Sequence, residues 1–249
     1  MKRLTTIILL SLFVAVSAVG QAPKTEATPL PSVDQVIENY VKALGGKDAI
    51  MKVTSRLTKG TFDFPAVGVS GAPAEFYAKA PNKSGFSIDV AGYGVVQEGF
   101  NGTVAWAQSP ETGLREKTGA ELADAKLDND FYGDLNLKQR YPKMEVKGKE
   151  KVGTREAYLI VASRPEGSPD KFYFDAQTWL LIRSDAERET PQGKALVESY
   201  LDDYRDIDGV KIPHANRLVS PMGEFIFKFT EVKQNVPIDD AKFNKPAGQ

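Results

Sequence analysis

The chain has 249 residues, of which 41% are hydrophobic and 26% are charged, a composition that allows one sizeable hydrophobic core. Its 32 basic and 33 acidic side chains nearly balance, so no basic field is present to attract nucleic acid. The chain has no cysteine, which excludes disulfide bonds and thiolate metal sites.

The first 20 residues have the pattern of a secretory signal peptide. Lys2 and Arg3 precede an apolar and hydroxyl-bearing stretch over 4–19, and Ala18 and Gly20 are small residues of the kind found at a cleavage site. The stretch is short for a membrane span, and a retained membrane anchor is the alternative. Because no cysteine follows it, we expect no lipid on the mature amino terminus.

These features predict three parts of the chain: a signal peptide over 1–20, a flexible linker over 21–31 and one folded domain over 32–249. The linker is polar and contains prolines, which is typical of an extended tether. We therefore expect a periplasmic protein, exported with its signal peptide cleaved.

The folded domain begins with an amphipathic helix. Ser32 and Gln35 have the spacing of a capping box, and Gly45-Gly46 ends the helical pattern. The apolar residues of one face are Val33, Val36, Ile37, Tyr40, Val41 and Leu44.

The period then changes to two, which predicts β-strands. Asn101-Gly102 is the clearest turn in this part of the chain. The first predicted strands are 54–62, 74–80, 84–90, 95–100 and 103–107.

A helical segment interrupts the strands. Thr118 and Glu121 form a second predicted capping box, and the segment is expected to break in two and to end before Tyr141. We expect it to lie across the mouth of the sheet as a lid, with Gly133 as a hinge. Its apolar positions are Leu122, Leu127, Phe131 and Leu135.

Seven more strands are predicted after the helical segment, and Asp208-Gly209 supplies the positive φ that a tight hairpin turn needs. Twelve strands with hairpin-length links indicate one strongly bent antiparallel sheet, in a mainly β member of the α+β class. The later strands are 145–152, 157–163, 171–175, 179–184, 196–205, 210–219 and 224–233.

Aromatic residues alternate along several strands. Phe225, Phe227 and Phe229 would share one face of the last strand, as would Phe86 with the apolar residues two and four positions on. Periodicity alone leaves two interpretations open, because these rings would suit a closed core as well as a cavity for a ligand.

Several segments together make the chain resemble the LolA/LolB-like lipoprotein-sorting and lipid-carrier family from about Val33 to Pro246. The resemblance implies an open half-barrel of about 11–12 strands, with helices covering a concave face whose cavity receives acyl chains of lipids or lipoproteins. It rests on Ala43-Leu44-Gly45-Gly46, Lys59-Gly60-Thr61, Phe100-Asn101-Gly102, Ala105-Trp106, Phe174-Asp175, Leu180-Leu181-Ile182-Arg183, the run from Tyr204 to Pro213, and Asn235-Val236-Pro237-Ile238-Asp239.

This resemblance favours the cavity, because acyl chains require a large sheltered apolar surface. The expected lining residues are Phe86, Ile88, Val90, Val104, Trp106, Leu159, Val161, Phe225, Phe227 and Phe229.

The patterns of an enzyme are missing from the sequence. His214 is the single histidine, and we expect it to be a partly exposed sheet residue, since no Gly-x-Ser-x-Gly elbow or cysteine nucleophile accompanies it. We expect no cofactor and no resident metal. Two alternatives are weaker: a calcium site among Asp202, Asp203, Asp206 and Asp208, for which turn chemistry is the better account, and a catalytic carboxylate pair drawn from Glu75, Asp89, Glu98 and Glu187.

The leading hypothesis is a periplasmic carrier for acylated lipids or lipoproteins, which would exchange its cargo with donor or acceptor proteins of the inner or outer membrane. The alternative is a sensor of the same fold that binds lipid or unfolded protein and controls a membrane partner.

Overall fold

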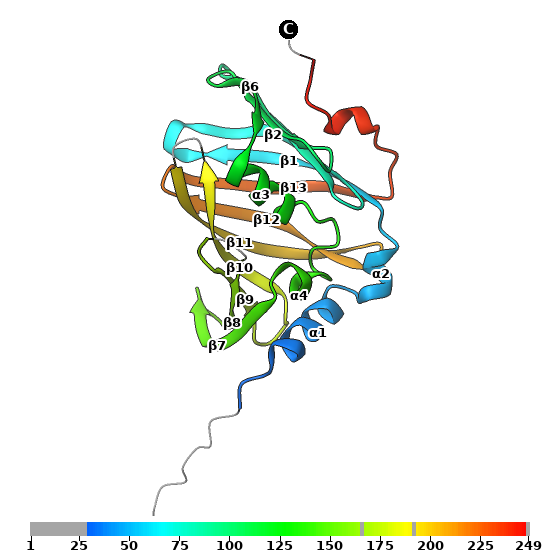
Figure 1. Cartoon of the computed structure of the whole chain (residues 1–249), viewed down its shortest axis with the longest axis vertical. Helices are drawn as coiled ribbons and strands as arrows, with labels where there is room; N and C mark the ends of the chain where they lie inside the picture. Colours follow the sequence, from blue (N-terminus) through cyan, green and yellow to red (C-terminus); the bar gives the residue numbers. More distant parts are fainter. Residues whose placement is uncertain (1–28, 165–166, 191–192, 248–249) are drawn as a thin grey trace, which may run out of the picture.

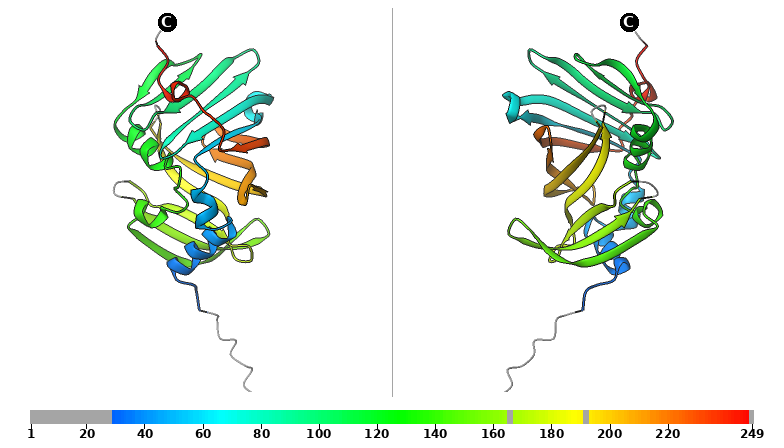
Figure 2. Two further views of the ribbon diagram at one scale, coloured as in Figure 1. Left: turned by 90° about the vertical axis from the view of Figure 1, so that its right-hand side faces the viewer. Right: turned by 60° about the vertical axis from the view of Figure 1, so that its left-hand side comes forward.

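Thirteen antiparallel strands form one continuous, strongly curved sheet in the computed structural model, which describes residues 29–164, 167–190 and 193–247 (Figure 1). The predicted signal peptide and residues 21–28 of the predicted linker lie outside the described residues. The sheet does not close, so the expected open half-barrel of the mainly β class is confirmed, as are its helices on the concave face (Figure 2). The strands are β1 (Ser55–Phe64), β2 (Val69–Lys79), β3 (Lys83–Val90), β4 (Gly94–Phe100), β5 (Ala105–Ser109), β6 (Gly113–Lys117), β7 (Lys143–Val152), β8 (Arg155–Ser163), β9 (Asp170–Asp175), β10 (Leu181–Thr190), β11 (Gly193–Ile207), β12 (Val210–Ser220) and β13 (Gly223–Gln234).

The strand order is β6-β5-β4-β3-β2-β1-β13-β12-β11-β10-β9-β8-β7. Two meanders therefore meet at the β1–β13 pair in the middle of the sheet. The sheet has one strand more than expected, because β6 was missed. Its residues Arg115, Glu116 and Lys117 are all charged, and β-propensity gives such a run no signal.

Short helices accompany the sheet, and the first begins as predicted. The Ser32 N–H donates to Gln35 Oε1 at 2.8 Å and the Gln35 N–H donates to Ser32 Oγ at 3.2 Å, which confirms the capping box. The helices are α1 (Val33–Ala43), α2 (Lys47–Met51), α3 (Gly119–Asp128) and α4 (Leu137–Arg140), with 3₁₀ turns η1 (Pro65–Val67) and η2 (Asp240–Phe243).

The end of α1 packs against the turn between β11 and β12. Asp208 and Gly209 have φ values of 51° and 83°, which confirms the predicted turn. A Cβ atom on Gly45 would lie 2.0 Å from the Gly209 carbonyl oxygen, so glycine is required there for the close approach. The Lys211 N–H donates to the Leu44 carbonyl at 2.8 Å and closes the junction.

The helical interlude is broken into α3 and α4, as expected, but its predicted capping box does not form. Thr118 precedes α3 without a side-chain hydrogen bond to it. Glu121 instead accepts two hydrogen bonds from the Arg115 guanidinium, each at 2.8 Å. A charge-assisted bidentate pair is stronger than a neutral cap, so Arg115 takes the acceptor.

Two apolar clusters lie on the inner, concave face. The first joins α1 and α4 to β8 and β9, and its core includes Val36, Tyr40, Tyr141, Ile160 and Phe174. The second is aromatic and lies on β1, β2, β3 and β13, with Phe62, Phe64, Phe76, Phe86, Phe225, Phe227 and Phe229 among its members.

The outer face of the β1–β6 half is covered by the segment after β13. Trp106 lies flat over Gly99, where an added Cβ atom would be 2.5 Å from the indole nitrogen. The indole N–H donates to the Phe243 carbonyl at 3.0 Å, and Phe243 packs on Tyr77. Glycine opposite an aromatic ring on a neighbouring strand allows this close packing.

His214 lies on β12 as expected, but its predicted partial exposure is wrong. Its exposed fraction is 4%, and Nδ1 lies 2.9 Å from the Ile212 carbonyl oxygen. The long flanking strands of a wide curved sheet bury this position, which the residue pattern around Pro213 does not reveal.

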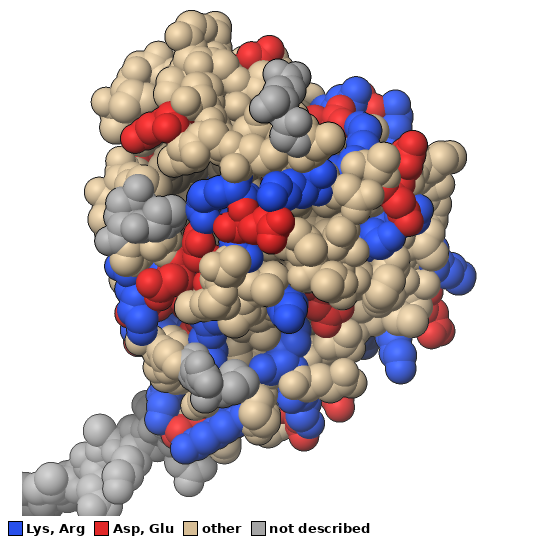
Figure 3. Space-filling model, turned by 45° about the horizontal axis from the view of Figure 1, so that its top comes forward, with Lys and Arg blue, Asp and Glu red and all other residues tan. Residues whose placement is uncertain are grey.

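No helix within 29–164, 167–190 and 193–247 is both long enough and apolar enough to cross a membrane. Figure 3 shows basic and acidic side chains interspersed over the face it presents, so that face carries no extended surface of one sign.

We predict that Asp240 stabilises the docked terminal turn η2 above acidic pH. Its carboxylate accepts hydrogen bonds from Lys79 at 2.8 Å and Lys83 at 2.6 Å, and these lysines lower the pKa of Asp240 to about 2. A carboxyl with a lowered pKa in the folded state contributes stability above its ordinary pKa and loses it as the pH falls towards 2.

Thermal unfolding of the wild type and Asp240→Asn across this range measures the effect. The wild type should unfold at the higher temperature at neutral pH, and the difference should vanish near pH 2. Glu111→Gln, an exposed acid without an ion pair in the described part of the chain, is the control and should show no such convergence. A difference that persists unchanged at low pH would contradict the prediction.

Candidate functional site

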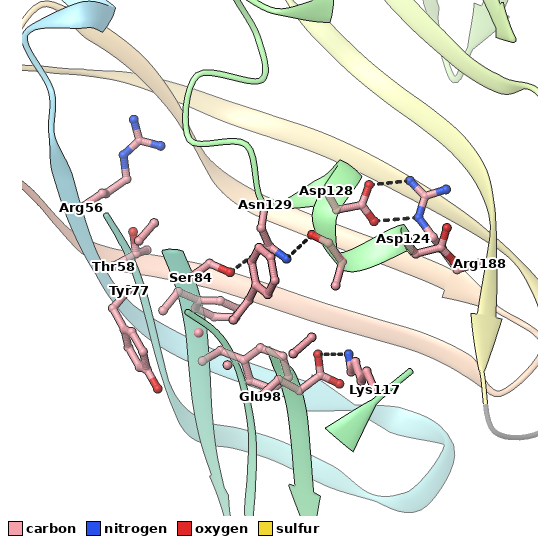
Figure 4. Close-up of a pocket in the computed structure, with 18 of the residues that line it drawn as sticks. Arg56, Thr58, Tyr77, Ser84, Glu98, Lys117, Asp124, Asp128, Asn129 and Arg188 are labelled. Carbon is pink, nitrogen blue, oxygen red and sulfur yellow. Dashed lines mark hydrogen bonds and ion pairs between the residues drawn. The ribbon is translucent and has the colours of Figure 1, made fainter. Parts of the chain in front are cut away.

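A cavity of about 570 Å³ lies between the inner face of the β1–β6 half of the sheet and α3 (Figure 4). We call it the larger cavity. The strands supply a mostly apolar floor, because residues of one parity on neighbouring strands share a face. The floor side chains are Phe76, Ala78, Phe86, Phe100, Ala105 and Phe229.

The side of the cavity formed by α3 is polar. Glu121, Asp124, Asp128 and Asn129 line it together with Ala125. The helix thus presents its polar face to the cavity.

Side-chain contacts hold α3 in place over the sheet. Asp128 accepts hydrogen bonds from Nε and Nη2 of Arg188 on β10, both at 2.8 Å (Figure 4). Asp124 pairs with Arg164, and Asn129 bonds with Ser84 on β3. We call these contacts the α3 clamp. No residue of α3 is buried, so polar contacts rather than apolar burial hold this helix over the cavity.

The remaining acidic groups of the cavity are also paired, with one exception. Glu98 accepts a hydrogen bond from Lys117 at 2.6 Å. The hydrogen bonds from Arg115 lower the pKa of Glu121 below its ordinary value. Glu189, beside the clamp, has no ion pair in the described residues.

A smaller cavity of about 220 Å³ adjoins the end of α1. Tyr40 donates from Oη to Asp134 at 2.7 Å and Tyr204 donates to the Leu181 carbonyl at 2.8 Å. Burial, and then the charge of Asp134, raises the pKa values of both phenols. They remain neutral hydrogen-bond donors with protein acceptors. Arg56 lines both cavities.

The structure brings two of the sequence-predicted lining residues, Phe86 and Phe229, to the floor of the larger cavity. Four others belong to the same aromatic cluster but lie outside the cavity lining, where side chains fill the interior: Ile88, Val90, Phe225 and Phe227.

The other four predicted lining residues do not line the larger cavity. Trp106 lies on the outer face under Phe243, and Val104 is half-buried in the β4–β5 turn. Leu159 and Val161 lie on the opposite face of β8 from Ile160, in an outer cluster with Tyr173. Because β8 is apolar on both faces, alternation could not show which face is inner.

The predicted lid residues occupy a different place from the one expected. Leu127, Phe131 and Leu135 pack against the cluster of α1, and Leu122 is half-buried on α3 without lining the cavity. Gly133 lies in the turn between α3 and α4, where its N–H donates to the Asp130 carbonyl at 2.9 Å. The segment does cover the cavity, but through its polar side chains.

Sequence reasoning also missed several residues that line the larger cavity. Phe76 and Ala78 could have been found, because they alternate on the predicted strand 74–80 beside Phe86. Arg56 and Arg188 gave no signal, because a charged residue on a strand normally marks the exposed face.

The described residues do not form the calcium site or the catalytic carboxylate pair that the sequence left as alternatives. Among the described residues, no group of three or more His, Asp or Glu side chains could hold a metal ion. Asp206 Oδ1 accepts the Gly209 N–H at 2.9 Å, which is turn chemistry. Of the four carboxylates considered for catalysis, only Glu98 lines the larger cavity, and Lys117 neutralises it.

Comparison with solved structures identifies the fold. A DUF1329 family protein from Desulfovibrio piger matches with a TM-score of 0.54 and 14% identity, over 85% of this chain and 97% of that one. A LolA superfamily protein from Nitrosomonas europaea matches with a TM-score of 0.54 and 12% identity, over 87% of this chain and 99% of that one. The chain has the LolA-like fold.

No family model matches the sequence, and no curated protein matches it either. At identities this low, the likeness establishes the LolA-like fold and nothing about a ligand.

Proposed function

We propose that the protein is a periplasmic carrier that binds the acyl chains of a lipid or lipoprotein in the larger cavity. The observation that carries this proposal is a cavity of about 570 Å³ with an aromatic floor on the inner face of the sheet. The volume lies within the range of small-molecule sites, which are mostly apolar with a few polar groups.

The energetics of burial fit a reversible carrier. Each methylene removed from water contributes about 0.8 kcal/mol, so ten methylenes contribute roughly 8 kcal/mol before the costs of ordering the chain. Glu98, Glu121, Asp124 and Asp128 are ion-paired, which leaves Glu189 as the one cavity carboxylate without an ion pair among the described residues. A single free carboxylate provides no acid–base pair, and this supports binding rather than acid–base catalysis.

Entry of the ligand would require α3 to move. The α3 clamp would open and the turn around Gly133 would take up the change, so that α3 contacts are exchanged for ligand contacts. The predicted signal peptide over 1–20 belongs to the same proposal, since it would deliver the chain to the compartment where such lipids travel.

Native mass spectrometry of the protein purified from its own cell envelope tests the proposal. We expect a bound lipid, and we expect delipidated protein to take up an added acyl probe. Protein that is empty when isolated and that also fails to bind oleyl alcohol or oleate would overturn the proposal. Intact mass of the exported protein checks removal of the signal peptide in the same experiment.

A further inference from the structure

Two polar side chains, one half-buried and one buried, stand opposite one another on the central strand pair. Arg56 on β1 and Gln234 on β13 are register partners, so their side chains project from the same face of the sheet. Arg56 lines both cavities. It is on the same face of β1 as Thr58, which is the register partner of Phe76 on β2. Arg56 therefore lies at the boundary of the larger and smaller cavities, and Gln234 is its neighbour on the adjacent strand.

Both side chains contain buried polar atoms that have no hydrogen-bond partner. Arg56 makes no ion pair with any described residue, its Nε has no hydrogen-bond partner, and its guanidinium lies 5.8 Å from the ring centroid of Phe131. Gln234 is 8% exposed, and both polar atoms of its amide lack a partner. Buried polar groups are almost always hydrogen-bonded, so each exception requires an explanation.

The other basic residues of the larger cavity do have partners, which makes Arg56 different. Lys117 pairs with Glu98, and Arg188 pairs with Asp128. Arg56 stands without a dashed contact in Figure 4. Burial lowers the pKa of Arg56 from its ordinary value, and the charge of Asp134 offsets this only in part. The Asp134 carboxylate already accepts the Tyr40 hydroxyl at 2.7 Å.

An ordered water would satisfy hydrogen bonds here but would leave the charge unbalanced. A guanidinium stays protonated at neutral pH and offers five N–H donors in a planar fork, which matches the oxygens of a carboxylate or phosphate. The Gln234 amide adds a donor beside it. An anionic oxygen group supplies acceptors for the Arg56 guanidinium and for the Gln234 amide nitrogen.

We propose that Arg56 and Gln234 form a head-group subsite for an anionic amphiphile, whose tail lies over Phe76, Phe86 and Phe229. The inference rests on the proposed function, since it names the class of ligand for that same cavity. The anionic group is a carboxylate, as in a fatty acid, or a phosphate, as in a lysophospholipid. The chemistry that Arg56 recognises is the same in both.

Ligands that share one tail and differ in head group test the subsite. Displacement of the neutral probe N-phenyl-1-naphthylamine from the delipidated full chain gives affinities for oleyl alcohol, oleate and oleoyl lysophosphatidic acid. The wild type should prefer at least one of the anionic ligands to the alcohol by about tenfold or more, the usual size of a charge-assisted contact. Whichever anion shows the preference identifies the head group.

Arg56→Gln should remove this preference and leave the alcohol affinity within about twofold, because the tail contacts remain. Gln234→Leu should reduce the preference, and Arg205→Gln, an exposed arginine on β11, is the matched control that should leave it unchanged. Equal wild-type affinity for all three ligands, or a preference retained in Arg56→Gln, would overturn the subsite while oleyl alcohol binding still supports the carrier. Absence of binding by every ligand would overturn both.

The melting temperature of the lipid-free protein provides a second readout. Because a half-buried charge without an ion pair does not stabilise the empty protein, Arg56→Met should melt at a temperature equal to or above that of the wild type, while it loses the anion preference. A purely structural role for Arg56 predicts the reverse, a lower melting temperature with the preference unchanged, and that result would contradict the subsite.

Discussion

Ala78→Trp is expected to weaken acyl-chain binding roughly a hundredfold while leaving the fold intact. Ala78 lies on the floor of the larger cavity, with its side chain directed into the cavity from β2. An indole ring there occupies the space of several methylenes, and losing four of them costs about 3 kcal/mol of binding free energy. Probe displacement by oleyl alcohol measures the loss, because this ligand has no charge for Arg56 to recognise.

A matched control separates filling of the cavity from the mere addition of a tryptophan. Lys59→Trp places the same ring on the neighbouring strand but on the outer face, where Lys59 pairs with Glu75 at 3.5 Å. This variant should bind as the wild type does. If Ala78→Trp folds normally and retains wild-type affinity, the larger cavity is not the binding site.

Asp170→Ala is expected to lower the free energy of unfolding by about 3–5 kcal/mol, the usual result of removing one partner from a buried charged network. Asp170 is 1% exposed and accepts the Tyr141 hydroxyl at 2.5 Å and Arg188 Nη1 at 3.3 Å. Burial and this hydrogen bond raise the pKa of Tyr141 well above its ordinary value, so the phenol remains a donor. Chemical denaturation measures the change.

Two further variants refine this second expectation. Tyr141→Phe removes a single hydrogen bond to a charged group and should cost less, about 1.5–3 kcal/mol. Asp202→Ala removes an acid whose side chain is 71% exposed, and it should change stability by less than about 0.5 kcal/mol. A loss in Asp170→Ala no larger than that of Asp202→Ala would show that the network does not stabilise the fold.

The local signals of the sequence predicted the elements well, because each depends on a few neighbouring residues. Ser32 with Gln35 and Asp208 with Gly209 carry their geometry in residue type alone. The second capping box failed for a reason that spacing cannot reveal, since β6 brings Arg115 within reach of Glu121. The competing partner arises from strand pairing.

The candidate site was predicted only in part, because the inner face of a strand is a tertiary property. Phe86 and Phe229 lie on the floor of the larger cavity, although the aromatic ladder alone left open which face is the inner one. Trp106 lies on the outer face, where it packs on Gly99 of the neighbouring strand and donates to the Phe243 carbonyl far along the chain. Sequence patterns could not identify Arg56 as a cavity residue, because a charged residue on a strand is expected to face solvent.

The pairing of β1 with β13 has a consequence for how the chain is made. Every other strand pair joins neighbours in the sequence, and a newly synthesised chain can form each of them early. The edge of β1 stays open, with unpaired backbone groups, until β13 emerges, and such edges invite aggregation. Arg56 and Gln234 are on those two strands. Pairing of β13 with β1 therefore brings these two residues together and, in the same step, covers the open edge of β1.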